Sequence, residues 1–321
     1  MTSKTRILIP GAIRERVVER LSETFDVVRI DAADPSLLDP EIAATIQGVA
    51  VVGRFGADMV ESLPALEIVS SFGVGYDGVD TAAAAARSVV VTNTPDVLND
   101  EVADTTIALL LNAIRQFPQA ETWLRQGRWV SEGNFPLTPL TLRGRTVGIY
   151  GLGRIGLAIA KRLEGFGVEI VYHTRSKREG LAYRYYPSLM EMASAVDTLI
   201  AIVPKTDETY KTINAEVLAA LGPTGVLVNV GRGWTVDEDA LAEALRTGVI
   251  AAAGLDVFQD EPNVPDALLS LPNVSLLPHV ASASVATRDA MAEHVAGNLL
   301  SWFSTGKALT PVPETPFVRR K

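Results

Sequence analysis

Short apolar runs alternate with segments of helical spacing along most of this chain. In its first hundred residues, apolar runs predict strands at residues 6–10, 27–30, 48–53, 67–72 and 89–93. Between them, residues 13–22 and 40–47 have apolar positions at helical spacing, and the alanine-rich residues 81–87 favour a helix. Buried strands that alternate with helices are typical of a parallel sheet covered on both faces.

A second series of the same kind begins at Thr146. Its predicted strands are residues 146–150, 168–173, 198–203, 225–230, 252–258 and 274–277. Before it lie a long predicted helix, residues 99–116, and an irregular arm, residues 127–141, rich in glycine, proline and aromatic residues. After it, the apolar periodicity of residues 285–301 predicts a helix that returns to the first domain. The pattern therefore predicts two domains, residues 1–98 with 286–321 and residues 99–285.

The second domain opens with a strand, a glycine-rich turn and a helix in the stretch TVGIYGLGRIGLAIAK, residues 146–161. Gly151 allows a tight bend, Gly153 lets the backbone approach a pyrophosphate, and Gly156 lets the helix pack against the strand. Leu152, Arg154 and Ile155 complete the turn. Because a helix N-terminus also attracts phosphate, this context predicts a dinucleotide site in a Rossmann-type domain.

The end of the next predicted strand bears on the cofactor. An enzyme that binds NAD usually places Asp or Glu there, about 20 residues after the glycines. This chain has His173, Thr174, Arg175 and Ser176 instead, followed by Lys177 and Arg178. Arginine can hold a 2′-phosphate through charge-assisted hydrogen bonds, which favours NADP over NAD, with Arg175 and Ser176 as contacts. The alternatives are a solvated basic turn and, for His173, either stacking near the adenine or a solvent-facing position.

Composition narrows the class of protein. The 321 residues carry a formal net charge of −9 without a basic block, which argues against nucleic acid as the main partner. The absence of cysteine excludes disulfides and thiolate catalysis. The N-terminal apolar run is too short for a signal peptide and no stretch is long enough to span a membrane, so we expect a cytoplasmic protein. No grouping of His, Asp and Glu has the spacing of a metal site.

Three candidate chemical groups fall just beyond strand ends of the second domain. His279 falls just beyond the predicted strand 274–277, where a catalytic group would face the cleft; His294 lies at helical spacing and reads as structural. Arg232 and Glu261 follow two other strands of the same predicted sheet. Singly, each could be a surface turn or a capped strand end. Together, beside a dinucleotide site, they predict a catalytic group, with His279 as the candidate proton donor near neutral pH.

At this point the chain resembles the D-isomer-specific 2-hydroxyacid dehydrogenases, most closely the NADPH-preferring glyoxylate/hydroxypyruvate reductases. The resemblance covers nearly the whole chain. It rests on SFGVGYDGVD from Ser71, TNTPDVLNDEVADTTIALLL from Thr92, GLGRIG, VNVGRG, GLDVFQDEP and LPHVASAS. It implies an α/β fold of two doubly wound parallel-sheet domains, a flavodoxin-like substrate domain and a Rossmann nucleotide domain with a cleft between them. It also implies reduction of a small 2-oxo acid to the D-2-hydroxy acid with NADP(H), or with NAD(H) as well.

The resemblance assigns a role to each site residue. Arg232 would bind the substrate carboxylate and polarise the 2-oxo group, His279 would donate the proton, and Glu261 would orient His279 and favour its charged form. The backbone N–H groups of Val74 and Gly75 would bind the carboxylate from the other domain. The implied cofactor contacts are Gly151, Leu152, Gly153, Arg154, Ile155, Gly156, Arg175, Ser176, Val203, Pro204, Thr209, Val230, Gly231, Arg232, Asp256 (near the nicotinamide), His279 and Ala281.

Two alternatives and one expectation about assembly remain open. The substrate could be a bulkier 2-oxo acid, such as phenylpyruvate or 2-oxogluconate. The chain could instead be a nucleotide-sensing protein of the corepressor kind, which the complete Arg, Glu and His set argues against. Trp123, Trp129 and Phe135 in and beside the arm favour an interface, and the resemblance implies a C₂ homodimer with Phe135 near the partner's site.

Overall fold

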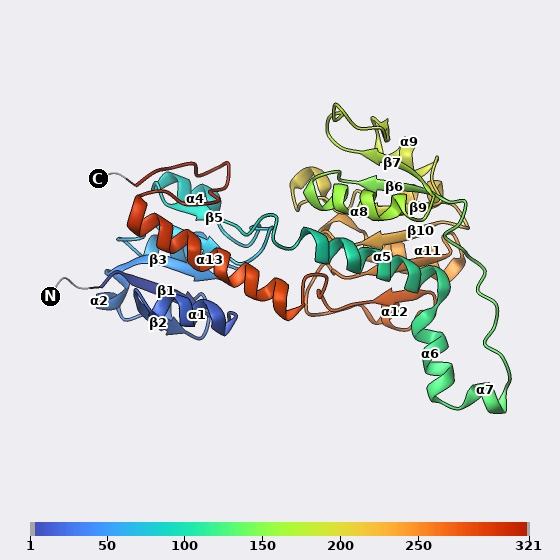
Figure 1. Ribbon diagram of the computed structural model, residues 1–321, viewed down its shortest axis with the longest axis horizontal. Helices are drawn as coiled ribbons and strands as arrows, with labels where there is room; N and C mark the ends of the chain where they lie inside the picture. Colours follow the sequence, from blue (N-terminus) through green and yellow to red (C-terminus); the bar gives the residue numbers. More distant parts are fainter. Residues whose placement is uncertain (1–3, 320–321) are drawn as a thin grey trace. The chain divides into compact units, whose positions relative to one another are not determined.

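The computed structural model describes residues 4–319, which form two compact units (Figure 1). One unit contains the residues up to Leu98 and those from Ala283 onward, and the other spans Asn99–Ser282. The sequence-based boundaries are residues 98 and 285. The assignment of substrate binding to one unit and nucleotide binding to the other stays a prediction at this point.

The first unit is built on a parallel sheet with strand order β2-β1-β3-β4-β5, the flavodoxin-like order. Its strands are β1 (Arg6–Pro10), β2 (Asp26–Ile30), β3 (Ile46–Val51), β4 (Ile68–Ser71) and β5 (Val90–Thr92). Its helices are α1 (Glu15–Ser22), the 3₁₀ turn η1 (Pro35–Leu37), α2 (Pro40–Ala43), α3 (Ala57–Ser62), α4 (Thr81–Ala86) and α13 (Val285–Thr305).

Helix α13 brings the end of the chain back to the first unit. It packs against α1, β3 and β4. Glu293 on α13 accepts hydrogen bonds from Arg16 at 2.6 Å and from Arg20 at 3.0 Å, both on α1. The buried hydroxyl of Ser70 on β4 donates to the Val295 carbonyl at 3.1 Å. Helix α13 is thus held to α1 and to the sheet of the first unit by both packing and hydrogen bonds.

The second unit carries a parallel seven-stranded sheet in the order β12-β11-β10-β9-β6-β7-β8 (Figure 1). Its strands are β6 (Thr146–Tyr150), β7 (Glu169–His173), β8 (Arg184–Tyr186), β9 (Thr198–Ala201), β10 (Val226–Asn229), β11 (Ala252–Leu255) and β12 (Val274–Leu276). Its helices are α5 (Asn99–Arg115), α6 (Phe117–Arg125), α7 (Arg128–Ser131), α8 (Arg154–Glu164), α9 (Leu189–Ala193), α10 (Ala215–Leu221), α11 (Glu238–Thr247) and α12 (Asp266–Leu269), with 3₁₀ turns η2 (Asp207–Thr209) and η3 (Gly233–Thr235).

Alternation along the strands gives the second sheet a core on each face. Val226 and Val228 on β10 point into the core shared with α5 and α8, whereas Leu227 points into the core shared with α9, α10 and α11. A sheet buried on both faces explains the continuous apolar runs of the sequence. The predicted α/β fold with two parallel sheets is confirmed.

Local details differ from the sequence-based expectations. The helix expected over residues 40–47 ends at Ala43, because Ile46 already belongs to β3. Helix α6 was not predicted; it follows Gln116, whose left-handed backbone (φ 54°) separates it from α5. The edge strand β8 is too short and polar to predict, and the arm begins with α7. Within residues 4–319, no helix is long and apolar enough to cross a membrane.

Candidate active site

In the glycine turn after β6, the packing of the chain requires two of the glycines, and the third leaves space that a ligand could occupy. A Cβ on Gly151, whose φ is 102°, would lie 2.6 Å from the Ile202 carbonyl oxygen. A Cβ on Gly156 would lie 2.2 Å from the Gly151 carbonyl oxygen. A Cβ on Gly153 would meet no atom of residues 4–319 within 4 Å. Packing therefore requires two of the glycines, and Gly153 keeps open a space that the chain itself does not use.

That space lies at the N-terminus of α8. Gly153 is the N-cap residue, and it makes no side-chain capping hydrogen bond to this end of the helix. The first N–H groups of the helix and its dipole therefore point toward the open position. Strand β6 lies between β7 and β9, which follow it in opposite directions across the sheet, so the turn occupies the switch point where α/β sheets bind ligands. These features fit a pyrophosphate group.

The turn that follows β7 supplies exposed cations and a hydroxyl, namely Arg175, Lys177, Arg178 and Ser176. The pKa of Glu208 in η2 is lowered chiefly by a hydrogen bond from the Thr206 side chain, and the charge of Arg175 adds to this effect. His173 has its Nδ1 2.9 Å from the Tyr186 carbonyl oxygen and its ring 5.5 Å from that of Tyr150. His173 is thus held by protein contacts on one nitrogen and one ring side.

Hydrogen bonds within the segment after β9 fix the conformation of its loop. The Thr209 hydroxyl donates to the Pro204 carbonyl oxygen at 2.8 Å and accepts from the Thr206 N–H at 2.9 Å. Thr209 is buried, so these bonds fold the loop that follows Val203. Its predicted contact with the cofactor stays a prediction.

Arg232 is positioned by a residue that the sequence analysis did not select. Asn229, 1% exposed at the end of β10, accepts from the Gly231 N–H at 3.1 Å and donates to the Arg232 carbonyl oxygen at 2.9 Å. The close approach of this turn to Val203 also requires glycine, since a Cβ on Gly231 would lie 2.9 Å from the Val203 carbonyl oxygen. The feature of the sequence that could have identified Asn229 is an amide side chain within an otherwise apolar strand.

His279 and Glu261 form a hydrogen-bonded pair. The His279 Nδ1 lies 2.7 Å from Glu261 Oε2, and the Phe258 N–H donates to Glu261 Oε1 at 3.0 Å. The pair is partly open, with 47% of the His279 side chain and 35% of the Glu261 side chain exposed. Because Nδ1 faces the carboxylate, Nε2 lies on the opposite edge of the ring. A substrate oxygen could accept a proton from that edge.

The electrostatics around Glu261 favour its charged form. Burial alone would raise the pKa of Glu261, but hydrogen bonds from His279 and from the Phe258 N–H, together with the charges of His279 and Arg232, hold that pKa below its usual range. The site therefore keeps a carboxylate beside the imidazole at neutral pH. Because the charge of Arg232 helps to lower the pKa of Glu261, Arg232 lies within electrostatic reach of the pair. Arg232, Glu261 and His279 are therefore gathered at one edge of the sheet.

Asp256 anchors the backbone around His279. Its carboxylate is 1% exposed and accepts from the N–H groups of Val280 at 2.8 Å and Ala281 at 3.0 Å. Its carbonyl oxygen accepts from the His279 N–H at 2.8 Å, and His279 has a left-handed backbone with φ 53°. Burial raises the pKa of Asp256, and the two N–H groups oppose that rise. Asp256 thus holds His279 in an uncommon conformation, a role beyond its predicted place near the nicotinamide.

In the other unit, Val74 and Gly75 follow β4 at the carboxyl end of its sheet. The Asn93 side chain donates to the Val74 carbonyl oxygen at 2.9 Å, and the Thr94 N–H donates to the Gly73 carbonyl oxygen at 2.8 Å. Gly73 has φ 150°, a conformation that disfavours other residues. These contacts define the loop, and the substrate contact of Val74 and Gly75 stays a prediction.

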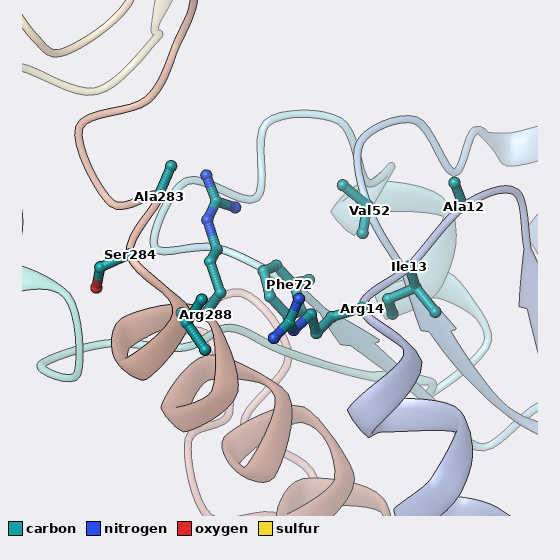
Figure 2. A pocket seen from close by; sticks show the side chains of 9 residues that line it. Ala12, Ile13, Arg14, Val52, Phe72, Ala283, Ser284 and Arg288 are labelled. Carbon is teal, nitrogen blue, oxygen red and sulfur yellow. The ribbon is translucent and has the colours of Figure 1, made fainter.

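A cavity of about 330 Å³ opens at the same end of this sheet. Its lining includes Val52, which follows β3, and Phe72, which follows β4. Figure 2 shows Arg288, from α13, beside Phe72, and Arg14, from the segment before α1, on the same cavity. The Arg288 guanidinium carbon lies 5.8 Å from the centre of the Phe72 ring, and Arg14 pairs with Asp289 at 2.8 Å. The cavity combines an apolar wall with positive charge.

In the part of the chain that the structure describes, no three or more His, Asp or Glu side chains are grouped as a metal site would need. The groups assembled at the sheet edge are instead an imidazole, a carboxylate and a guanidinium.

Comparisons with known proteins identify a family and a similar solved structure. Residues 107–281 match the family described as D-isomer specific 2-hydroxyacid dehydrogenase, NAD binding domain. The NADPH-dependent glyoxylate/hydroxypyruvate reductase of Sinorhizobium meliloti, solved in complex with NADP and malonate, is 66% identical, with a TM-score of 0.98 over 99% of this chain and 100% of that chain.

Two plant proteins are also similar. Hydroxyphenylpyruvate reductase of Plectranthus scutellarioides is 50% identical over 84% of this chain and 86% of its own length. Glyoxylate/hydroxypyruvate reductase A of Arabidopsis thaliana is 44% identical over 91% of this chain and 94% of its own length. All three similarities extend well beyond the glycine turn.

Proposed function

Because the chain belongs to the D-isomer-specific 2-hydroxyacid dehydrogenase family, we propose that it reduces a small 2-oxo acid, glyoxylate or hydroxypyruvate, to the D-2-hydroxy acid with NADPH. The observation that carries this proposal is the His279–Glu261 pair, 2.7 Å apart, with Arg232 close enough to lower the pKa of Glu261. A binding protein without turnover has no need for an acid, its carboxylate and a carboxylate clamp in one place.

The cofactor would be held by the glycine turn and by the turn of exposed cations after β7. The open position at Gly153 and the uncapped N-terminus of α8 suit the pyrophosphate, and Arg175 with Ser176 would bind the 2′-phosphate. The NADP complex of the S. meliloti relative supports NADP(H), with NAD(H) accepted as well. When bound, the nicotinamide supplies the hydride.

The residues of the chain would orient the substrate and handle the proton. Arg232 would pair with the substrate carboxylate through its planar guanidinium. His279 would donate a proton from Nε2 to the 2-oxo oxygen, where charge develops during reduction. Glu261 would keep the imidazole oriented and its charged form favoured, while Asp256 holds the backbone at His279. The N–H groups of Val74 and Gly75 are the predicted contacts from the other unit.

Substrate size is the point on which the relatives differ. The S. meliloti reductase shares 66% of its sequence with this chain, against 50% for the Plectranthus protein named after a bulkier acid. This difference supports glyoxylate or hydroxypyruvate over phenylpyruvate or 2-oxogluconate.

A homodimer in the cytoplasm completes the proposal. The arm carries apolar side chains that lie open in the single chain, with Trp129 59%, Val130 95% and Leu137 97% exposed. Side chains of this kind are typical of an interface. Phe135, whose ring packs edge-on against Trp123 at 5.7 Å, is the predicted contact with the partner's site. Cell fractionation tests the compartment.

The function is tested by mixing the purified chain with NADPH and glyoxylate and identifying the product. We expect glycolate to form in step with loss of NADPH absorbance. The Tyr183→Phe variant, altered far from the acid–base pair, is the matched control and should behave like the wild type. No NADPH oxidation with glyoxylate or hydroxypyruvate would contradict the proposal.

A further inference from the structure

Residues 174–178, here called the cation loop, are held by an unusual set of hydroxyl contacts. Residues 175–178 are exposed and polar, so a loop of this composition has no apolar side chain to fix its shape. It leaves β7 at Thr174 and carries Arg175 and Ser176, the proposed contacts of the 2′-phosphate. Its conformation must therefore be set by hydrogen bonds to its backbone.

Tyr172 on β7 holds the far end of the loop. Its side chain is 0% exposed, yet its hydroxyl reaches both backbone groups of Arg178. The Arg178 N–H donates to Tyr172 Oη at 3.0 Å, and the Tyr172 O–H donates to the Arg178 carbonyl oxygen at 3.3 Å. One buried hydroxyl thus satisfies a donor and an acceptor of the same loop residue.

Tyr185 on β8 holds the near end. Its O–H donates to the Thr174 carbonyl oxygen at 3.3 Å, and its ring lies 5.4 Å from that of Tyr172. Between the two ends, the Thr174 hydroxyl donates to the Ser176 carbonyl oxygen at 2.7 Å. The loop is therefore fixed at both ends by adjacent tyrosines and across its turn by a threonine.

The loop is also tied to the glycine turn. The Arg178 guanidinium donates to the carbonyl oxygen of Leu152, which lies between Gly151 and Gly153. A guanidinium that bridges two loops fixes their spacing. The pyrophosphate site and the cation loop are thereby joined by one side chain.

We propose that Tyr172 and Tyr185 are positioning residues that preset the cation loop for the 2′-phosphate of NADP and so set the preference for NADP over NAD. This inference rests on the proposed NADP preference. A loop that is already ordered loses less conformational freedom when a ligand binds, so ordering raises affinity without a new contact. The gain applies to ligands that use the loop, namely those with a 2′-phosphate.

The experiment measures binding of adenosine 2′,5′-bisphosphate and 5′-AMP to the full chain by calorimetry, without turnover. Tyr172→Phe and Tyr185→Phe each delete one hydroxyl from the loop while keeping the ring. Tyr183→Phe is the matched control, because the Tyr183 hydroxyl donates to Glu164 on α8 at 2.7 Å and not to the loop. Hydrogen exchange of the Arg178 amide, which Tyr172 accepts from, reports the loop directly in each variant.

We expect the double variant to bind the bisphosphate about tenfold more weakly while 5′-AMP binding stays within about twofold, since the three neutral hydrogen bonds of the two hydroxyls to the loop are lost. Exchange at Arg178 should quicken in Tyr172→Phe and not in Tyr183→Phe. Tyr185→Phe, whose ring is only partly buried, keeps the test valid if the buried Tyr172→Phe variant folds poorly.

Two results would overturn the inference. An unchanged ratio of the two affinities, or an equal loss for both ligands, would mean that the tyrosines merely stabilise the domain. A wild-type chain that binds both ligands equally would instead remove the NADP preference itself, and the inference with it, while the exchange data would still show whether the tyrosines order the loop.

Discussion

At the scale of single residues, the acid–base pair depends on how its backbone is held. His279 sits in a left-handed conformation that its own side chain does not favour, and buried Asp256 compensates by accepting from the two following N–H groups. Glu261 in turn is fixed by the Phe258 N–H. The pair is thus placed by hydrogen bonds from neighbouring backbone before any substrate arrives, which is the condition for efficient proton transfer.

The His279→Gln variant tests the proton donor. Glutamine keeps a hydrogen-bonding side chain of similar length but cannot donate a proton as imidazolium does. We expect kcat for glyoxylate reduction to fall about 10²–10⁴-fold while Tm stays within a few degrees of the wild type. Steady-state kinetics and thermal melts check both. A kcat within a few-fold of the wild type would show that another group supplies the proton.

The Glu261→Gln variant tests the carboxylate through pH. Without its negative charge the imidazolium of His279 loses its counter-ion, so the alkaline limb of the pH–rate profile for reduction should move to lower pH. The profile of kcat/KM against pH measures this. Superimposable profiles for the wild type and the variant would contradict the role of Glu261.

The same variant has a predicted effect on stability in acid. Because the folded protein holds the pKa of Glu261 below its usual range, the carboxylate contributes stability at pH values above that range, and this is lost as pH falls through the lowered pKa. Tm of the wild type should therefore fall more steeply than that of Glu261→Gln on acidification below about pH 5. Parallel Tm curves would mean that the pair contributes nothing to folding.

At the scale of elements, the turn from β6 to α8 combines a structural and a functional demand. Gly151 and Gly156 allow close packing against Ile202 and within the turn, whereas Gly153 leaves an open position before the uncapped helix. Glycine is therefore needed for packing at two of these positions and for open space at the third. This difference allows one substitution to separate folding from binding.

Gly153→Ala and Gly156→Ala form that comparison. A methyl group at Gly153 enters the open space, so stability should change by about 0.5 kcal/mol while affinity for both NADPH and NADH falls. A methyl group at Gly156 would press on the Gly151 carbonyl oxygen, 2.2 Å away, so unfolding free energy should fall by about 1–3 kcal/mol. Thermal melts and fluorescence titration with each cofactor provide the data. Equal effects of the two variants would refute the distinction.

The elements also show what the sequence could predict. Strand positions, the glycine turn and the gathering of Arg232, Glu261 and His279 follow from local patterns, because parallel strands end at one edge. Helix α6 and strand β8 did not follow, since one depends on the left-handed Gln116 and the other on pairing with β7. The positioning roles of Asn229, Tyr172 and Tyr185 depend on contacts between distant residues, which a local pattern does not contain.

At the scale of the whole molecule, the arm of the second unit presents a surface that a single chain leaves uncovered. Trp129 and Leu137 are 59% and 97% exposed, and the proposed dimer would bury them. Replacing Leu137 with Glu and Trp129 with Ser should convert dimer to monomer in light scattering, because charge and polarity oppose apolar burial. The Arg246→Ala variant, which breaks an exposed ion pair with Glu243, is a control distant from the arm in sequence. A wild-type chain that is a fully active monomer would contradict the dimer.

The central claim is that this chain reduces small 2-oxo acids with NADPH. The most direct measurement is kcat/KM for glyoxylate, hydroxypyruvate, phenylpyruvate, 4-hydroxyphenylpyruvate and 2-oxogluconate, each with NADPH and with NADH. The account predicts the highest values for glyoxylate or hydroxypyruvate, and higher values with NADPH than with NADH. Higher values for one of the three bulkier acids, or for NADH, would contradict it.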